Sequence, residues 1–232
     1  MACSSSITES EKEFKDEILK KPVLEIVIGV FEQNLINQGL VNLQKIDSSI
    51  LVDLRYSSEN NFFGKDVYDD LENAYLPKDV AEKLSEVNKD LKKKYPNFSL
   101  LVFDAVRPLS VQQILWDALD SIPVNLRKAY VADPKAGSLH NYGCAVDLSI
   151  FDNLKDSLLD MGTNYDYFGY LAYPRKEEEM LKNGLLTSGQ IANRLLLRNA
   201  MRAVGFVSIR SEWWHFNCNS LDKAKQKYSL IK

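Results

Sequence analysis

The sequence predicts a single α+β domain whose central sheet is mostly antiparallel and flanked by helices. The candidate strands do not alternate regularly with the candidate helices, as they would in a parallel α/β fold. No internal repeat or low-complexity linker divides the 232 residues, a length between that of one large domain and that of two small ones. We therefore expect a flexible leader over residues 1–22 and one domain over residues 23–232.

The first quarter of the domain carries the weakest signals. The apolar, β-branched run 23–30 predicts a strand or a buried segment, and 31–40 is ambiguous, with Gly39 as a stop. Partial alternation predicts a strand over 47–56. The Asn-rich segment 60–64 then turns the chain, and its two aromatic residues would suit a pocket wall as well as a plain turn.

The middle of the chain holds the clearest helix. Apolar side chains recur at helical spacing from Pro77 to Tyr95, with Pro96 just beyond the end. A buried strand is expected over 99–103, followed by a second helix from Ser110, which can cap it, to Leu119. Between the last two elements the chain must turn a strand-to-helix corner.

The last third alternates loops with a strand and a helix. Residues 129–137 and 161–166 are expected to be loops, and 144–151 a strand. Charges and glycine in 170–189 suggest a surface excursion or lid. The periodic segment 190–204 predicts a helix that ends before a glycine.

Composition narrows the class of protein. Hydrophobic residues make up 45% and charged residues 26%, as in ordinary globular proteins, and a net charge of −3 gives no reason to expect nucleic acid. No apolar run approaches the ~20 residues of a membrane span. The three cysteines are too few for a disulfide framework. Cys3, followed by serines, resembles the mature start of a bacterial lipoprotein, so the alternatives are a lipid anchor and a chance cysteine in a cytosolic terminus.

The chain contains only two histidines, and both stand beside carboxylates and aromatic residues. His140 and Asp147 flank a glycine that lets a loop bend into a strand. His215 follows Glu212 by three residues, a spacing that requires a kink if both are to face one site. Two histidines and one carboxylate leave a fourth position open on a tetrahedral zinc, as hydrolytic sites require.

Two further residues complete a hydrolytic site in this interpretation. Glu212 suits the carboxylate that takes a proton from the water at the metal. Arg107, at the strand-to-helix corner, is the candidate cation for the developing oxyanion. The alternatives are two buried structural histidines and a structural ion pair for Arg107. Cys144 and Cys218 lie near the ligands in sequence, so a thiolate ligand competes with this set.

The two motifs 138–147 (Ser-x-His-x-x-Gly-x-Ala-x-Asp) and 212–215 (Glu-Trp-Trp-His) resemble the zinc D-alanyl-D-alanine dipeptidases, the VanX-like branch of the D,D-peptidase family M15. The resemblance covers most of the chain beyond about residue 45. Three further segments carry it: Asp53-Leu-Arg-Tyr56 with Asn61 and Phe62, Asp104-Ala-Val-Arg107-Pro108, and Met161-Gly-Thr-x-Tyr-Asp166. Leu139 departs from the pattern, since this branch often carries a small polar residue there.

The resemblance implies a zinc D,D-peptidase (hedgehog-like) fold with one Zn²⁺ per chain, held by the three residues His140, Asp147 and His215. Glu212 would be general base and then acid, and Arg107 would stabilise the tetrahedral intermediate. The implied positions for a small dipeptide substrate are Ser138, Tyr56 and Asp166, with Asp166 facing the ammonium.

The resemblance also implies a role in bacterial cell-wall metabolism. The activity would be cleavage of D-Ala-D-Ala in the periplasm or at a lipid-anchored position, with a cytoplasmic enzyme as the alternative. A D,D-carboxypeptidase acting on longer peptidoglycan peptides is the nearest rival. A non-catalytic zinc-bearing binding module is the rival of another class, although such a module needs neither Glu212 nor Arg107.

Overall fold

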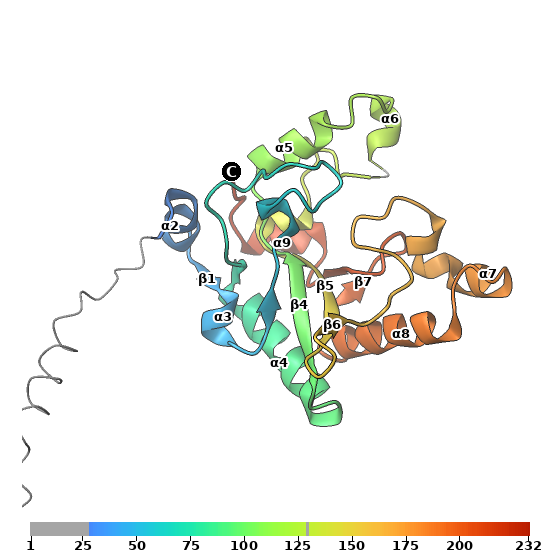
Figure 1. The fold of residues 1–232 in the computed structure, drawn as a ribbon. Coiled ribbons are helices and arrows are strands. Elements are labelled where there is room, and N and C mark those ends of the chain that lie inside the picture. The colour runs from blue at the N-terminus through green and yellow to red at the C-terminus, as the bar shows by residue number, and fades with distance from the viewer. Residues whose placement is uncertain (1–27, 129) are drawn as a thin grey trace, which may run out of the picture.

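Two long strands, β4 (Phe98–Asp104) and β5 (Ala145–Asp152), pair antiparallel in the middle of the sheet (Figure 1). In the computed structural model of the chain, residues 28–128 and 130–232 are described. The expected leader at 1–22, with its anchor candidate Cys3, and most of the expected strand at 23–30 lie outside the described residues.

The main sheet has the strand order β2-β4-β5-β8-β7, with β6 paired to β5 at one end. The added strands are short: β2 (Leu51–Val52), β6 (Ser157–Leu158), β7 (Val207–Ser208) and β8 (His215–Asn217). Among the strands of the described residues, only β2 and β4 pair in parallel. A second sheet pairs β1 (Leu40–Asn42) with β3 (Tyr75–Pro77). The mixed α+β fold with a mostly antiparallel sheet is therefore confirmed.

Two longer helices, α4 and α8, contact each other beside the sheet (Figure 1). The α-helices are α2 (Val30–Asn37), α3 (Leu43–Ile46), α4 (Lys78–Lys94), α5 (Leu109–Asp117), α6 (Val124–Arg127), α7 (Glu177–Lys182), α8 (Ser188–Ala203) and α9 (Leu221–Lys227). Short 3₁₀ turns cover Arg55–Ser57, Leu139–Tyr142, Tyr170–Ala172 and Pro174–Lys176. No helix in the described parts of the chain is both long and apolar enough to span a membrane.

The strand predicted over 47–56 is wrong for most of its length, since only β2 is a strand there. The Asp47 side chain accepts hydrogen bonds from the backbone N–H of Ser49 at 3.0 Å and from its hydroxyl at 2.7 Å. This local bonding folds the start of the segment into a turn, because a short polar side chain competes with the strand ladder. The end of the segment enters a 3₁₀ turn that buries Tyr56.

The segment 170–189 lies largely at the surface, as expected, but it also contains a helix. This helix is α7, whose Glu177 carboxylate accepts a hydrogen bond at 2.6 Å from Arg198 on α8. This buried ion pair attaches the segment to the domain. The helix predicted from Ser110 to Leu119 is α5, which begins at Leu109. Ser110 therefore lies in the first turn of α5 and does not cap it. The helices predicted over 77–95 and 190–204 are confirmed to within about two residues.

Candidate active site

The three expected metal ligands come from two adjacent strands and the turn that leads into one of them. His140 lies in the 3₁₀ turn Leu139–Tyr142, and Asp147 on β5 is paired directly with His215 on β8. Gly143 ends the turn with a φ of 62°, and a Cβ there would come within 2.5 Å of Pro77 Cδ. Glycine is therefore required at this bend for two reasons, backbone conformation and space.

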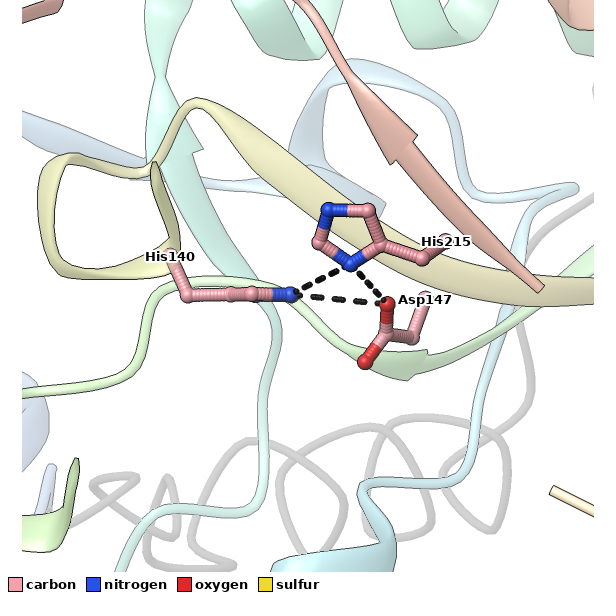
Figure 2. A group of neighbouring side chains, drawn as sticks. All are labelled: His140, Asp147 and His215. Carbon is pink, nitrogen blue, oxygen red and sulfur yellow. Dashed lines mark hydrogen bonds and ion pairs between the residues drawn. The ribbon is translucent and has the colours of Figure 1, made fainter. Parts of the chain in front are cut away.

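The donor atoms of these residues converge (Figure 2). His215 Nδ1 lies 2.9 Å from Asp147 Oδ1 and 3.2 Å from His140 Nε2, and His140 Nε2 lies 3.4 Å from Asp147 Oδ1. One ligand atom from each residue lies within 4.8 Å of the others. Among the described residues no cysteine belongs to this group, so its donor set is two nitrogens and one oxygen.

Outer hydrogen bonds orient both imidazole rings toward the point of convergence. His140 Nδ1 lies 2.7 Å from the carbonyl oxygen of Ala105, and His215 Nε2 lies 2.8 Å from Asn217 Oδ1. Each oxygen accepts a hydrogen bond from the ring, so in the neutral form of each imidazole His140 Nε2 and His215 Nδ1 are the unprotonated atoms. Such outer partners accompany metal-ligating histidines and select their tautomer. The donor set and its supports therefore fit a zinc ion.

Electrostatics make the centre suited to a cation. Burial raises the pKa of the Asp147 carboxyl, but His140 and His215 outweigh burial and hold this pKa well below its usual range. Burial lowers the pKa of His215, whereas the hydrogen bond to Asp147 raises it, with a net pKa of about 9. His215 thus holds a proton next to Asp147, and a metal ion would replace that proton on binding.

Arg107 lies at the edge of this centre and also forms a structural ion pair. Its Nε and one terminal nitrogen donate to Asp104 Oδ2 at 3.0 and 2.5 Å, and the same terminal nitrogen is 3.8 Å from Asp147 Oδ2. The β4–β5 register is irregular between Val102 and Asp104, and an irregularity of this kind can re-aim a side chain. Burial lowers the pKa of Arg107, but the negative charge of Asp104 and the nearby tyrosines raise it by more, so the guanidinium stays charged.

Glu212 lies in the loop just before β8, so the kink that its spacing from His215 required is present. Its Oε2 is 3.8 Å from His215 Nδ1. Burial raises the pKa of its carboxyl. Glu212 is therefore beside the three ligands without belonging to their group.

A cavity of about 500 Å³ opens over the centre and is lined by the three expected substrate-binding residues, Tyr56, Ser138 and Asp166. The Tyr56 hydroxyl donates to Asp166 Oδ2 at 2.9 Å. Burial and the nearby Asp147 charge raise the pKa of Asp166 well above its usual value. Ser138 caps the 3₁₀ turn by accepting from the His140 backbone N–H at 3.3 Å. Trp214 forms part of the cavity wall.

Sequence reasoning missed two residues that touch the ligands. Asn217 orients His215, and the Tyr165 hydroxyl donates to Asp147 Oδ2 at 3.1 Å. Asn217 could have been found, because residues i and i+2 of a strand share a face. Tyr165 reaches the centre from a loop, and no spacing in the sequence indicates that contact.

The chain is similar to known peptidases over most of its length. A family model described as D-ala-D-ala dipeptidase, peptidase M15, matches residues 36–230. The D-alanyl-D-alanine dipeptidase of Escherichia coli (strain K12) is 32% identical over 177 residues, which are 76% of this chain and 83% of the relative. That of Enterococcus faecalis is 26% identical over 191 residues, 77% of this chain and 90% of the relative. The solved LdcB LD-carboxypeptidase aligns with a TM-score of 0.41 and 19% identity, over 66% of this chain and 63% of its own.

Proposed function

The chain belongs to the D-Ala-D-Ala dipeptidase family of peptidases, and from this premise we propose that it hydrolyses free D-Ala-D-Ala with one zinc ion in bacterial cell-wall metabolism. The observation that carries the proposal is the convergence of His140, Asp147 and His215 below a cavity that also holds Glu212 and Arg107. The relatives named above, which are bacterial dipeptidases, support the substrate class.

Zinc would be held by His140 Nε2, Asp147 Oδ1 and His215 Nδ1, the three atoms that the outer hydrogen bonds leave free. When bound, the ion supplies Lewis acidity that polarises the peptide carbonyl and makes water a nucleophile at neutral pH. Tyr165 would hold the second oxygen of Asp147 in place through its hydroxyl.

Glu212 would act as the general base and then as the general acid. It takes a proton from the attacking water and afterwards delivers it to the amine that leaves. Burial raises the pKa of Glu212, which brings the carboxyl closer to the range in which a group can both accept and release a proton. Its place beside His215, 3.8 Å away, keeps it near the reacting atoms.

Arg107 would stabilise the negative charge that develops on the carbonyl oxygen. Its guanidinium is buried and held by Asp104, so it does not need to reorganise during the reaction. Asp104 in turn is held by the Tyr68 hydroxyl, which donates to its Oδ1 at 2.5 Å. The charge is therefore fixed in position before the substrate arrives.

Asp166 would recognise the free ammonium of the dipeptide. Burial has raised the pKa of this carboxyl, and a cationic ammonium beside it would restore its charged form. Beyond Asp166 the aromatic rings of Phe168 and Tyr130 line the cavity and pack edge to face with centroids 5.0 Å apart. These rings limit the space for an acyl group on the amine, which favours a dipeptide over a longer peptide. Ser138 would donate its hydroxyl proton to the substrate.

The test compares free D-Ala-D-Ala with its N-acetylated form. The protein should hydrolyse the first and be poor on the second, because a site built to pair a charged group rejects an analogue that lacks it by about 10⁴. Asp166→Ala should lower the ratio of the two hydrolysis rates, because it should slow hydrolysis of the free dipeptide more than that of the acetylated one. The exposed Asp120 provides a matched control, Asp120→Ala, which should keep the ratio.

Comparable wild-type rates on both substrates would refute the dipeptidase proposal in favour of a carboxypeptidase. A protein that binds zinc and the dipeptide but turns over neither substrate would be a binding module instead. Assays with L-Ala-L-Ala and a muropeptide complete the comparison.

A further inference from the structure

A second cavity, of about 680 Å³, lies beside the loop that carries Asp166. We call it the loop cleft. Tyr165 lines it and also contacts Asp147, so this ring separates the loop cleft from the metal centre. The lining residues are Arg55, Asn60, Phe103, Ser149, Leu158, Leu159, Asp160, Met161, Gly162, Thr163, Asn164, Tyr165, Gln190 and Trp213. Apart from Tyr165, which holds Asp147, the proposed dipeptidase reaction uses none of the polar side chains in this set.

Two polar atoms at the loop cleft have no hydrogen-bond partner within the described residues: Ser149 Oγ and Arg55 Nε. Ser149 is only 1% exposed, and it follows Asp147 by two positions on β5. Because alternate residues of a strand share a face, its hydroxyl projects on the same side of the sheet as the metal centre. A buried hydroxyl and a buried guanidinium N–H that lack partners are costly, and a hydrogen-bond acceptor held next to them would remove that cost.

The cleft carries one charge of each sign. The Arg55 guanidinium lies over the Phe103 ring at 4.8 Å, and one terminal nitrogen pairs with Asp53 at 2.9 Å, which leaves Nε for another acceptor. Asp160 is held by the Gly162 backbone N–H at 2.8 Å and by Gln190 at 2.9 Å. Its two oxygens can still accept further bonds, because a carboxylate has about four lone-pair sites.

We propose that the loop cleft is a binding site for a free, small, zwitterionic amino acid such as alanine. Arg55 and Ser149 donate hydrogen bonds to its carboxylate, and Asp160 pairs with its ammonium. The apolar part of the cleft lining, which includes Leu158 and Met161, accommodates a short aliphatic side chain. A simple anion would meet the Asp160 charge without compensation, whereas a zwitterion satisfies both charges.

This site is separate from the proposed dipeptidase chemistry and does not depend on it. The reaction would nevertheless release a ligand of this class, so D-alanine is the probe of choice. The tryptophans report on the two sites, and the variants below distinguish the sites, because the rings of Trp213 and Trp214 pack with centroids 5.4 Å apart. Trp213 lines the loop cleft, Trp214 lines the metal cavity, and Trp116 on α5 lines neither.

The experiment is a titration of the ¹⁵N-labelled, zinc-loaded protein with D-alanine, followed through the three indole N–H signals after assignment by Trp→Phe variants. Trp213 donates its indole N–H to Thr163 at 2.8 Å in the wall of the cleft, so its signal should shift and saturate. Trp116 should not respond. Acetate and ethylammonium, which each carry one half of the zwitterion, should bind more weakly than D-alanine.

Three variants test the contacts. Arg55→Gln should weaken the Trp213 response by about tenfold or more, as expected for a lost charged hydrogen bond, and Asp160→Asn should also weaken it. Ser149→Ala removes only an unpartnered hydroxyl, so this variant should fold as the wild type does and still bind D-alanine more weakly. Asp166→Ala serves as the control, since it alters the metal cavity and should leave the Trp213 response intact.

The proposal is overturned if Trp213 shows no saturable shift. It is equally overturned if the shift persists at full affinity in both Arg55→Gln and Ser149→Ala, or if Asp166→Ala alone abolishes it. Acetate binding as tightly as D-alanine would replace the amino acid by a simple anion and contradict the role of Asp160. None of these results bears on turnover of D-Ala-D-Ala, so the two proposals fail separately.

Discussion

Replacing Asn217 with alanine should weaken zinc binding although Asn217 is not expected to touch the ion. The Asn217 side-chain oxygen accepts the proton of His215 Nε2 at 2.8 Å. In the neutral ring this bond leaves the other nitrogen, Nδ1, unprotonated, and it directs Nδ1 at Asp147 and His140. In the alanine variant the ring can rotate and the proton can move to Nδ1, the atom proposed to bind zinc.

The expected loss is about 10–100-fold in zinc affinity, the usual effect of removing an outer partner of a metal-ligating histidine. This corresponds to about 1.4–2.7 kcal/mol, which is more than the ~1 kcal/mol net value of an ordinary hydrogen bond. The excess arises because two things are lost together, the bond itself and the orientation of His215. The carbonyl of Ala105 still orients His140, so the site should be weakened rather than abolished.

The affinity can be measured by competition with a chromophoric chelator at constant pH. His140→Ala is the reference for ligand loss and should retain little zinc. Asn219→Ala is the matched control, because the Asn219 amide donates to the Cys218 sulfur, at 3.7 Å, and to none of the three expected metal ligands. Wild-type zinc affinity in Asn217→Ala, with His140→Ala depleted as expected, would refute the assignment of His215 Nδ1 as a ligand atom.

Three further substitutions test the proposed general base, the bend at Gly143 and the cap of helix α8. Glu212→Gln should keep zinc and fold but lose about 10²–10⁴-fold in turnover of D-Ala-D-Ala; near-wild-type rates would remove Glu212 from its proposed role. Gly143→Ala should lower the melting temperature and the zinc content together, since the new Cβ would meet Pro77; an unchanged protein would contradict the tight bend. The Thr187 side chain caps α8 by accepting a hydrogen bond from the Gln190 backbone N–H. Thr187→Ala should therefore lower the free energy of unfolding by about 0.5–2 kcal/mol, measured by chemical denaturation, without changing the zinc content.

The sequence by itself determined which residues could build the site. With only two histidines in the chain, any His-based centre had to use both, and the motif around each supplied its own carboxylate. Helix periodicity likewise determined α4 and α8, because an amphipathic helix of four or more turns repeats its pattern often enough to be recognised. The mostly antiparallel sheet followed from the order of the elements.

Short elements were decided by tertiary structure. The two-residue strand β2 and the turn around Asp47 depend on which partner the backbone finds, a long-range strand or a nearby side chain. The local sequence does not show which of these two partners is the more stable, because either one can satisfy the same backbone N–H and C=O groups. The ion pair between Glu177 and Arg198 attaches the segment 170–189 to α8, although the charges of this segment predicted only a surface position.

Tertiary structure also decided which groups each site residue contacts. Arg107 was open to two interpretations, structural ion pair or catalytic cation, and the fold places it 2.5 Å from Asp104 and 3.8 Å from Asp147, within reach of both roles. Tyr165 contacts Asp147 from 18 positions away, and the loop cleft behind it combines residues from β5, its neighbouring loops and α8. Side-chain chemistry is local to the sequence, whereas distance and burial, which set the charge and partner of each group, exist only after the chain has folded.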